Sequence, residues 1–299
     1  MNIGWAVRQG WALARRSGWA VGVLFAANLG LAALAALPIY QGIESFTSHS
    51  VVGRELGRGF STDWLVDFAF NNPGSFGHYA TVILAVGLVS MSLNSILAGG
   101  VLSHFRTPDQ KCSLGDFLRG VGRYFWRMAG LLVIGLICYW IVFKLVHEEL
   151  GGWVEHQTDG WTDDRTVFAT RLALLLLLLL SLGFVNLVMD YARVRLVLEE
   201  GTGVIHAFLA SLGFSLGCLG KAAGVYLVPS ACGLALLGVY RLVFPWALVN
   251  ANAGGGAEVR FTLALAGMFL AQQLVMIGRY WFRVATWGGE WALYARVRG

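Results

Sequence analysis

Six apolar stretches, each about as long as a membrane is thick, divide this chain and restrict how it can fold. A hydrocarbon core of about 30 Å requires about 20 helical residues. In lipid a single segment can satisfy its backbone amides only as a helix. We therefore predict an all-α membrane protein with six transmembrane helices, in one integral membrane domain covering residues 1–299. The spans are expected at about 19–40, 79–101, 127–147, 167–189, 222–244 and 261–282.

The composition supports a lipid-facing surface. Hydrophobic residues make up 57% of the chain and charged residues 13%, whereas soluble domains carry about 25% charged residues. The net charge of +5 does not indicate nucleic-acid binding, because the basic residues flank the apolar stretches instead of clustering on one polar face. We therefore expect membrane lipids, and no nucleic acid, among the partners.

The distribution of charge predicts the orientation. Fifteen of the 22 Lys and Arg residues lie before the first stretch, in the second–third and fourth–fifth connections, or at the C-terminal end, with Arg127 and Arg279 counted at the inner edges of the third and sixth spans. Only four lie in the three connections on the opposite side. Excess Lys and Arg mark cytoplasmic segments. We expect both termini in the cytoplasm.

Two spacings are compatible with internal repetition. The segment 117–120, Phe-Leu-Arg-Gly, resembles Phe-Leu-Ala-Ser at 208–211, 91 positions later, and Asn94 and Asn186 are 92 positions apart. The repeat would be a hairpin of two spans preceded by a cytoplasmic amphipathic helix, and three such hairpin repeats would account for the chain. Residues 4–16 would form the first such helix, with Trp5, Trp11 and Ala12 on its apolar face. Similar apolar composition can also produce such matches, so both interpretations stay open.

Polar residues inside the predicted spans are the first candidates for function, because they are expensive in lipid. Asn186, Asp190 and Arg193 lie at i, i+4 and i+7 and therefore share one helix face. One interpretation is a cytoplasm-facing polar cavity between the second, fourth and sixth spans. The other is helix packing through hydrogen bonds of about 0.6–2 kcal/mol each. No pair of buried carboxylates is expected for a proton relay. The candidate intramembrane cluster is Asn94, Asn186, Asp190, Arg193, Gln272 and Gln273.

The motifs argue against catalysis. Gly213–Gly217 matches G-x-S-x-G around Ser215 but lies in an apolar helical stretch, whereas a nucleophile elbow needs a strand–turn–helix. The acidic loop 148–165 matches no calcium or zinc ligand pattern. The four cysteines lack metal-ligand spacing, and the chain has no Walker A or dinucleotide motif. We expect no enzyme activity, cofactor or metal.

Aromatic residues in the predicted external loops suggest a contact surface. Residues 62–70 alternate polar and aromatic side chains, which fits either a short helix lying in the outer leaflet or a surface that binds a partner. The candidate external surface is Trp64, Phe68, Phe70, Trp153 and Trp161.

One segment carries a resemblance. Residues 189–199, Met-Asp-Tyr-Ala-Arg-Val-Arg-Leu-Val-Leu-Glu, together with Gln272-Gln273-Leu274 and Arg279-Tyr280-Trp281, resemble a group of bacterial six-span proteins. That group is similar to the membrane domain attached to some glycerophosphodiester phosphodiesterases. The resemblance covers about the C-terminal two thirds of the chain. It implies a helical fold in the bacterial inner membrane and implies no activity.

These observations favour a non-catalytic membrane subunit or scaffold that binds a protein partner, or a second copy of itself, in the bilayer. The alternative is a transporter or lipid-handling protein that uses the polar cavity described above.

Overall fold

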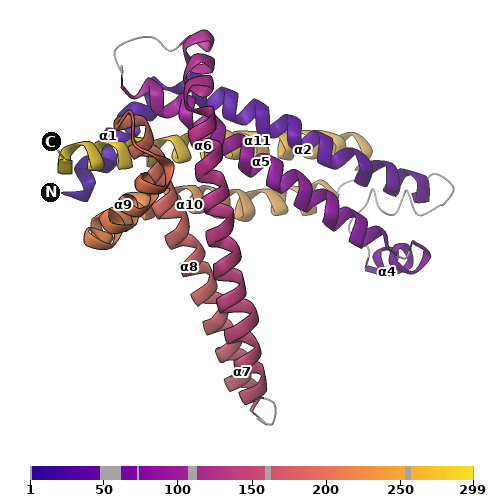
Figure 1. The fold of residues 1–299 in the computed structure, drawn as a ribbon. Helices are drawn as coiled ribbons and strands as arrows, with labels where there is room; N and C mark the ends of the chain where they lie inside the picture. Colours follow the sequence, from indigo (N-terminus) through magenta and orange to yellow (C-terminus); the bar gives the residue numbers. More distant parts are fainter. Residues whose placement is uncertain are drawn as a thin grey trace. The chain divides into compact units, whose positions relative to one another are not determined.

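The computed structural model describes residues 2–47, 62–72, 74–106, 113–158, 163–252 and 257–298 (Figure 1). These residues form helices and contain no strand, which confirms the all-α prediction for the described part of the chain. The elements are α1 (Ile3–Arg16), α2 (Gly18–Thr47), α4 (Thr62–Asn71), α5 (Ser75–His104), α6 (Leu114–Val142), the π-helical segment η1 (Phe143–Leu150), α7 (Gly151–Thr158), α8 (Asp164–Leu198), α9 (Val204–Gly217), α10 (Leu219–Asn252) and α11 (Ala257–Arg298).

Five of the described helical segments are long and apolar enough to cross a membrane. They are Gly18–Gly42, Ser75–His104, Leu114–Thr158, Arg165–Leu198 and Leu219–Val243. Each contains one of the first five predicted spans, apart from the last residue of the fifth. The sixth predicted span, 261–282, lies within α11, which is not among these five. The side chains of residues 257–265 are outside the described set.

The chain divides into two compact units. Unit 1 comprises Met1–Gly18, Ser95–Ala231 and Phe282–Gly299, and unit 2 comprises Trp19–Asn94 and Cys232–Trp281. Long helices pass from one unit into the other: α5, α10 and α11 each contribute one end to unit 1 and the rest to unit 2.

In unit 1, α1 is an amphipathic helix, as predicted for residues 4–16. Asn2 caps it by accepting a hydrogen bond from the Gly4 amide. The buried face consists of Ala6, Val7, Gly10 and Ala14, whereas Arg8, Arg15 and Arg16 are exposed. Trp5 and Trp11 are half-buried, but Ala12 is exposed, so its predicted place on the apolar face is wrong.

Small residues let α1 and α11 approach closely within unit 1. A Cβ atom added to Gly10 would lie 2.2 Å from the Ala285 carbonyl oxygen and 2.6 Å from the Gly289 backbone nitrogen. Neither distance is possible for a real side chain. The two backbones can therefore touch only because position 10 is glycine, as in the small-residue contacts of membrane helices.

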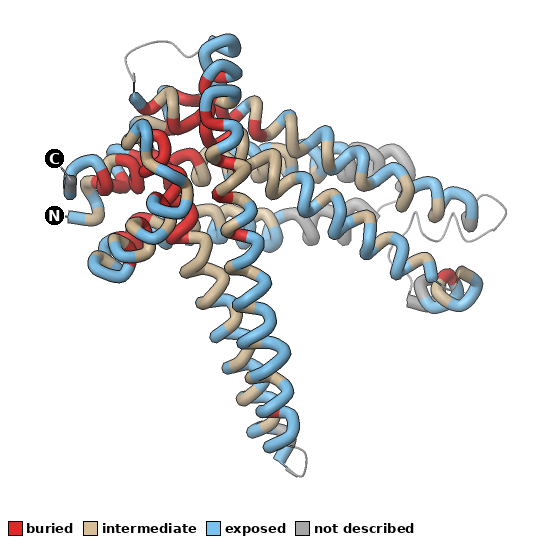
Figure 2. Tube along the Cα trace, viewed as in Figure 1, coloured by how far each residue is buried: buried red, intermediate tan, exposed pale blue. Residues whose placement is uncertain are grey.

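The segments α6, η1, α7 and α8 form a long helical hairpin in unit 1, which is buried mainly at one end, with Val154 the buried residue of α7 at the other (Figure 2). The buried end includes Met128, Leu131 and Ala192, which are fully buried. Further along, the surface is mainly apolar and exposed, and it includes Ile137, Trp140 and the leucines of α8. This distribution fits a helix hairpin that passes from a protein core into lipid.

In unit 2, α2 and α5 are joined by a polar contact between two asparagines. Asn28 and Asn94 donate reciprocally to one another through their amides at 2.9 Å in each direction. The Ser90 hydroxyl also donates to the side-chain oxygen of Asn28, Oδ1, at 2.7 Å. Elsewhere in this unit, the Phe68 ring of α4 meets Phe76 edge-on, with centroids 6.0 Å apart.

Candidate functional site

The most highly charged buried site of unit 1 is built around Asp190. This carboxylate is fully buried and accepts from Arg193 Nη1 at 2.5 Å, from Arg283 Nη2 at 2.8 Å and from Trp287 Nε1 at 3.2 Å. A second contact of 2.8 Å joins Arg283 Nη1 to the other carboxylate oxygen. The Arg283 guanidinium also stacks over the Trp287 ring, 5.0 Å from its centroid. Asp190 thus holds two cations in place.

Helical periodicity on two elements creates this site. On α8, Asn186, Asp190 and Arg193 follow one face at i, i+4 and i+7. On α11, Arg283, Trp287 and Glu290 repeat the same spacing. Because Arg283 and Trp287 both donate to Asp190, the two faces meet. The helices stay in contact further along, where the Tyr294 hydroxyl donates to Glu199 at 2.8 Å.

A second carboxylate of the cluster, Glu290, has no such partners. Its side chain is fully buried, and neither carboxylate oxygen has a hydrogen-bond partner among the described residues. Burial raises the pKa of Glu290 well above its usual value, and the nearby Asp190 charge raises it further. The Arg283 and Arg193 guanidiniums oppose these two effects. Chemically, this arrangement can hold a proton in the core of unit 1.

Unit 1 contains other buried polar groups besides Asp190 and Glu290. The hydroxyls of Tyr191, Ser211 and Ser215 are buried without hydrogen-bond partners among the described residues. The Phe214 ring packs between Tyr191 and Tyr294, with centroid distances of 5.1 and 5.2 Å. Ser215 lies near the end of α9, as predicted for the G-x-S-x-G stretch, and no described base contacts it.

Two groups of ion pairs lie near the end of α8, one partly buried around Glu199 and one more exposed around Glu200. Glu199 accepts from Arg195 Nε at 3.0 Å as well as from Tyr294. Glu200 is bound by the Arg106 and Arg123 guanidiniums, and the hydrogen bond from Arg106 holds its pKa below the usual range. Arg106 Nη2 also donates to the Leu198 carbonyl at 3.1 Å, which satisfies a carbonyl at the end of α8.

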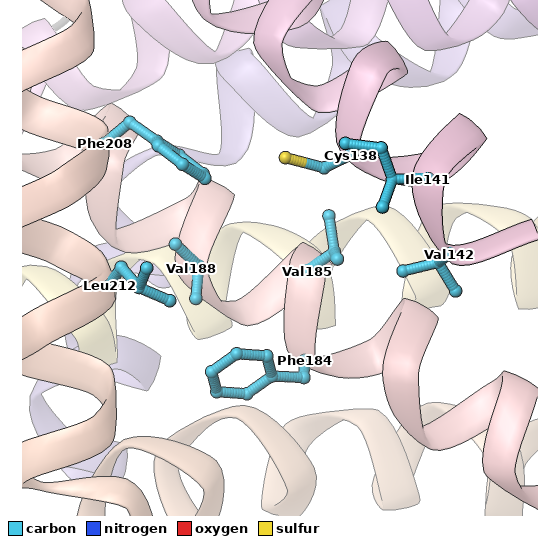
Figure 3. Close-up of a pocket in the computed structure, with 8 residues that line it drawn as sticks. All are labelled: Cys138, Ile141, Val142, Phe184, Val185, Val188, Phe208 and Leu212. Carbon is cyan, nitrogen blue, oxygen red and sulfur yellow. The ribbon is translucent and has the colours of Figure 1, made fainter. Parts of the chain in front are cut away.

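Unit 1 also contains an apolar groove of about 210 Å³ between α6, α8 and α9 (Figure 3). Its lining is hydrocarbon and aromatic apart from one thiol, so it differs from the polar cavity considered for a transporter. The lining residues are Cys138, Ile141, Val142, Phe184, Val185, Val188, Phe208 and Leu212. Asn186 and Tyr139 are sequence neighbours of the lining and bond to each other at 2.8 Å.

The predicted intramembrane residues fall into both units. Asp190 and Arg193 form an ion pair in unit 1, and Asn186 lies one helical turn away. Asn94 lies in unit 2 and bonds to Asn28. Gln272 and Gln273 are also in unit 2, where Gln272 is exposed and Gln273 half-buried.

The predicted external aromatic residues also differ in their surroundings. Phe70 and Trp153 are exposed, at 83% and 60% of their surface. Phe68 is only 4% exposed and packs on Phe76, which removes it from any exposed contact surface. The side chain of Trp64 and the whole of Trp161 lie outside the described residues.

Sequence reasoning missed the α11 half of the site. It counted Arg283 only as a cytoplasmic charge and expected no pair of buried carboxylates, whereas Asp190 and Glu290 are both fully buried. A usable signal was present, because Arg283, Trp287 and Glu290 have the same spacing as the predicted triplet on α8.

Within the described ranges, no group of three or more His, Cys, Asp or Glu side chains is arranged to hold a metal ion. Comparison of the chain with protein-family models, with curated proteins and with solved structures found no match.

Proposed function

We propose that this protein is a non-catalytic membrane scaffold that binds a partner protein through an exposed helix face in the bilayer. The observation that carries the proposal is a leucine stripe on α8. Its residues lie at i, i+3, i+4, i+7 and i+8, and their exposed fractions run from 43% to 72%. The stripe comprises Leu172, Leu175, Leu176, Leu179 and Leu180.

The spacing of the leucine stripe is that of helix-to-helix packing. Side chains at these intervals form one face of a helix, and the same repeat places knobs into the holes of a facing helix in coiled coils. In lipid, such contacts depend on close packing because burial of apolar surface gives no extra driving force. A partner helix from another protein would cover this face of the hairpin, and the ion-paired core of unit 1 would anchor the hairpin.

For the whole chain we propose six spans with α11 as the sixth, both termini in the cytoplasm, and a location in the bacterial inner membrane. The charge distribution and the resemblance of residues 189–199 support this arrangement. Repetition of a hairpin unit has further support from α1 and α9. Each has 14 residues, and each is followed by a single residue, Ser17 or Cys218, before a long helix begins.

Site-specific photo-crosslinking in native membranes tests the scaffold proposal. A photoreactive amino acid replaces Leu176 in the stripe, and the matched control replaces Leu84 of α5, which is 69% exposed. We expect a discrete protein adduct from position 176 and only lipid adducts from position 84. Lipid adducts alone from both positions, or the same protein adducts from both, would contradict the proposal.

A second candidate is a lipid-handling protein, and the groove between α6, α8 and α9 favours it. Its apolar lining suits an acyl chain, and the neighbouring Tyr139–Asn186 pair offers polar atoms to a headgroup. Native mass spectrometry of the purified chain tests this candidate. It predicts a retained lipid that is lost when Val185 is replaced by Trp to fill the groove, while Leu84→Trp retains the lipid. Equal lipid retention in both variants would exclude the groove as the binding site.

A further inference from the structure

Glu290 is a fully buried acidic residue that the scaffold proposal does not use. An ionised carboxylate without a partner is very costly in a protein interior, and such a group normally becomes neutral. Glu290 has no hydrogen-bond partner among the described residues at either oxygen. The charged groups that act on Glu290 include Asp190, a second carboxylate that already binds two guanidiniums.

The charges around Glu290 are also compatible with a state in which Glu290 is ionised. Asp190 contributes one negative charge, and Arg193 and Arg283 contribute two positive charges, so the cluster has one surplus cation when Glu290 is neutral. Ionisation of Glu290 would bring the cluster to electrical neutrality. Arg193 also has a spare donor, because its Nε has no hydrogen-bond partner among the described residues. The second anion therefore already has a counterion within the site.

The other elements packed on this part of α11 add few competing charges. α1 and α10 bring uncharged groups against Gly289, namely the backbone of Ala6 and Gly10 and the side chain of Val225, and Phe105, which follows α5, packs its ring against Trp291. α9 contributes the uncharged Phe214, Ser211 and Ser215, and Cys218 ends that helix. Arg106, which follows α5, is bound to Glu200. The titratable and charged groups that interact electrostatically within this cluster include Asp190, Arg193, Arg283, Cys218 and the tyrosines Tyr139, Tyr191 and Tyr226.

We propose that Glu290 is a proton-binding site whose two states are coupled to the Asp190–Arg193 ion pair. In the protonated state, Glu290 is neutral and Arg193 stays on Asp190. On deprotonation, the carboxyl O–H bond breaks, the proton passes to water, and the carboxylate attracts the Arg193 guanidinium. Arg193 then leaves Asp190, which keeps Arg283 and Trp287. The contact between α8 and α11 thereby depends on the protonation of one buried group.

Infrared spectroscopy of the full-length protein in lipid nanodiscs tests this proposal, because a protonated carboxyl has a C=O stretch distinct from that of a carboxylate. We expect this band in the wild-type protein at neutral pH and its loss in Glu290→Gln. Glu155→Gln, which removes an exposed carboxylate on α7, is the matched control and should keep the band. Absence of the band in the wild type, or its persistence in Glu290→Gln, would overturn the proposal.

The coupling has its own test. In Asp190→Asn both guanidiniums lose their carboxylate, so Glu290 should ionise and the protonated-carboxyl band should disappear at neutral pH. A band of undiminished intensity in a folded Asp190→Asn protein would refute the transfer of Arg193. If a variant fails to fold, selective ¹³C labelling of glutamate carboxyls in the wild-type protein remains decisive. The band must shift with that label, and a band that does not shift refutes the assignment to Glu290.

The pH dependence of folding stability gives an independent test, because a raised pKa at Glu290 fixes the direction in which stability changes with pH. The raised pKa of Glu290 means that the folded state binds more protons than the unfolded state between the two pKa values, so stability falls as pH rises through that window. Glu290→Gln should remove this fall. Its unfolding temperature should exceed that of the wild type by a margin that grows with pH above the usual glutamate range. A constant margin, or a loss of stability that does not change with pH, contradicts proton binding at Glu290.

Discussion

At the scale of single residues, Asp190 organises the charged part of the unit 1 core. One carboxylate receives donors from its own helix and from α11, and all of its surface is buried. Replacing a buried ion pair by apolar groups is often tolerated, whereas removing one partner leaves a buried charge without compensation. Asp190 should therefore be much more sensitive to substitution than any exposed acidic residue.

Asp190→Asn should lower the free energy of unfolding by about 3–5 kcal/mol, because Arg193 and Arg283 lose their shared counterion in a buried site and an ionised Glu290 replaces it for Arg193 alone. Thermal unfolding in detergent micelles measures the change. Asp116→Asn is the control, since Asp116 pairs with Arg119 at 2.9 Å on an exposed helix face. Equal unfolding temperatures for the two variants would show that the buried ion pair contributes no more to stability than the exposed one.

At the scale of elements, unit 1 depends on close helix approach, and unit 2 on a polar contact. α1 meets α11 at Gly10, where the partner atoms are backbone and cannot rotate away. α2 meets α5 through the Asn28–Asn94 pair. The two contacts make different predictions.

Gly10→Ala should destabilise the protein by about 1–3 kcal/mol, because the new methyl group forces α1 away from α11. Gly122→Ala is the matched control: Gly122 is also helical, and a Cβ there meets nothing within 4 Å. The control should increase stability by about 0.5–1 kcal/mol, as expected for replacing a helical glycine by alanine. Chemical unfolding in mixed micelles measures both, and effects of the same sign would refute the close-approach argument.

Asn94→Ala should reduce stability by about 0.6–2 kcal/mol, the range for interhelical hydrogen bonds in membranes. The double variant with Asn28→Ala should cost little more than either single one, because each substitution already breaks the same reciprocal pair. Additive losses in this double-mutant cycle would mean that the two asparagines act separately. If Asn94→Ala kept its stability but lost partner binding, Asn94 would have a role in binding instead of helix packing.

Hydropathy predicted five of the membrane-crossing candidates because span length is a local property of the sequence. The stretch 79–101, for example, lies wholly within the described span Ser75–His104. The helix 4–16 was predicted for the same reason, although Ala12 was placed on the wrong face. The pairing of faces is not local. Arg283 and Glu290 follow an apolar stretch and look like ordinary cytoplasmic charges until α8 is placed beside them.

Phe68 illustrates the same limit at an aromatic position. The sequence predicts aromatic side chains in an external loop, but it does not reveal that Phe76, eight positions later, covers one of them. Asn28 is a polar residue within the first predicted span, and only the structure identifies Asn94 and Ser90 as its partners.

At the scale of the whole molecule, the proposed arrangement has six membrane crossings, with the ends of α8 and α11 on the cytoplasmic side. Five described helices have the length and hydropathy of spans, and α11 is the proposed sixth. If α11 did not cross, the C-terminus would lie on the opposite side from Glu200.

The most direct measurement is accessibility of single cysteines, introduced into a chain whose four native cysteines have been replaced, to a membrane-impermeant thiol reagent. The positions are Glu155 in α7, Glu200 after α8 and Val297 near the end of α11. In intact spheroplasts, the six-span arrangement predicts labelling at position 155 and protection at positions 200 and 297, with labelling of both after permeabilisation. Labelling of position 297 but not 200 in intact spheroplasts would contradict the six-span arrangement.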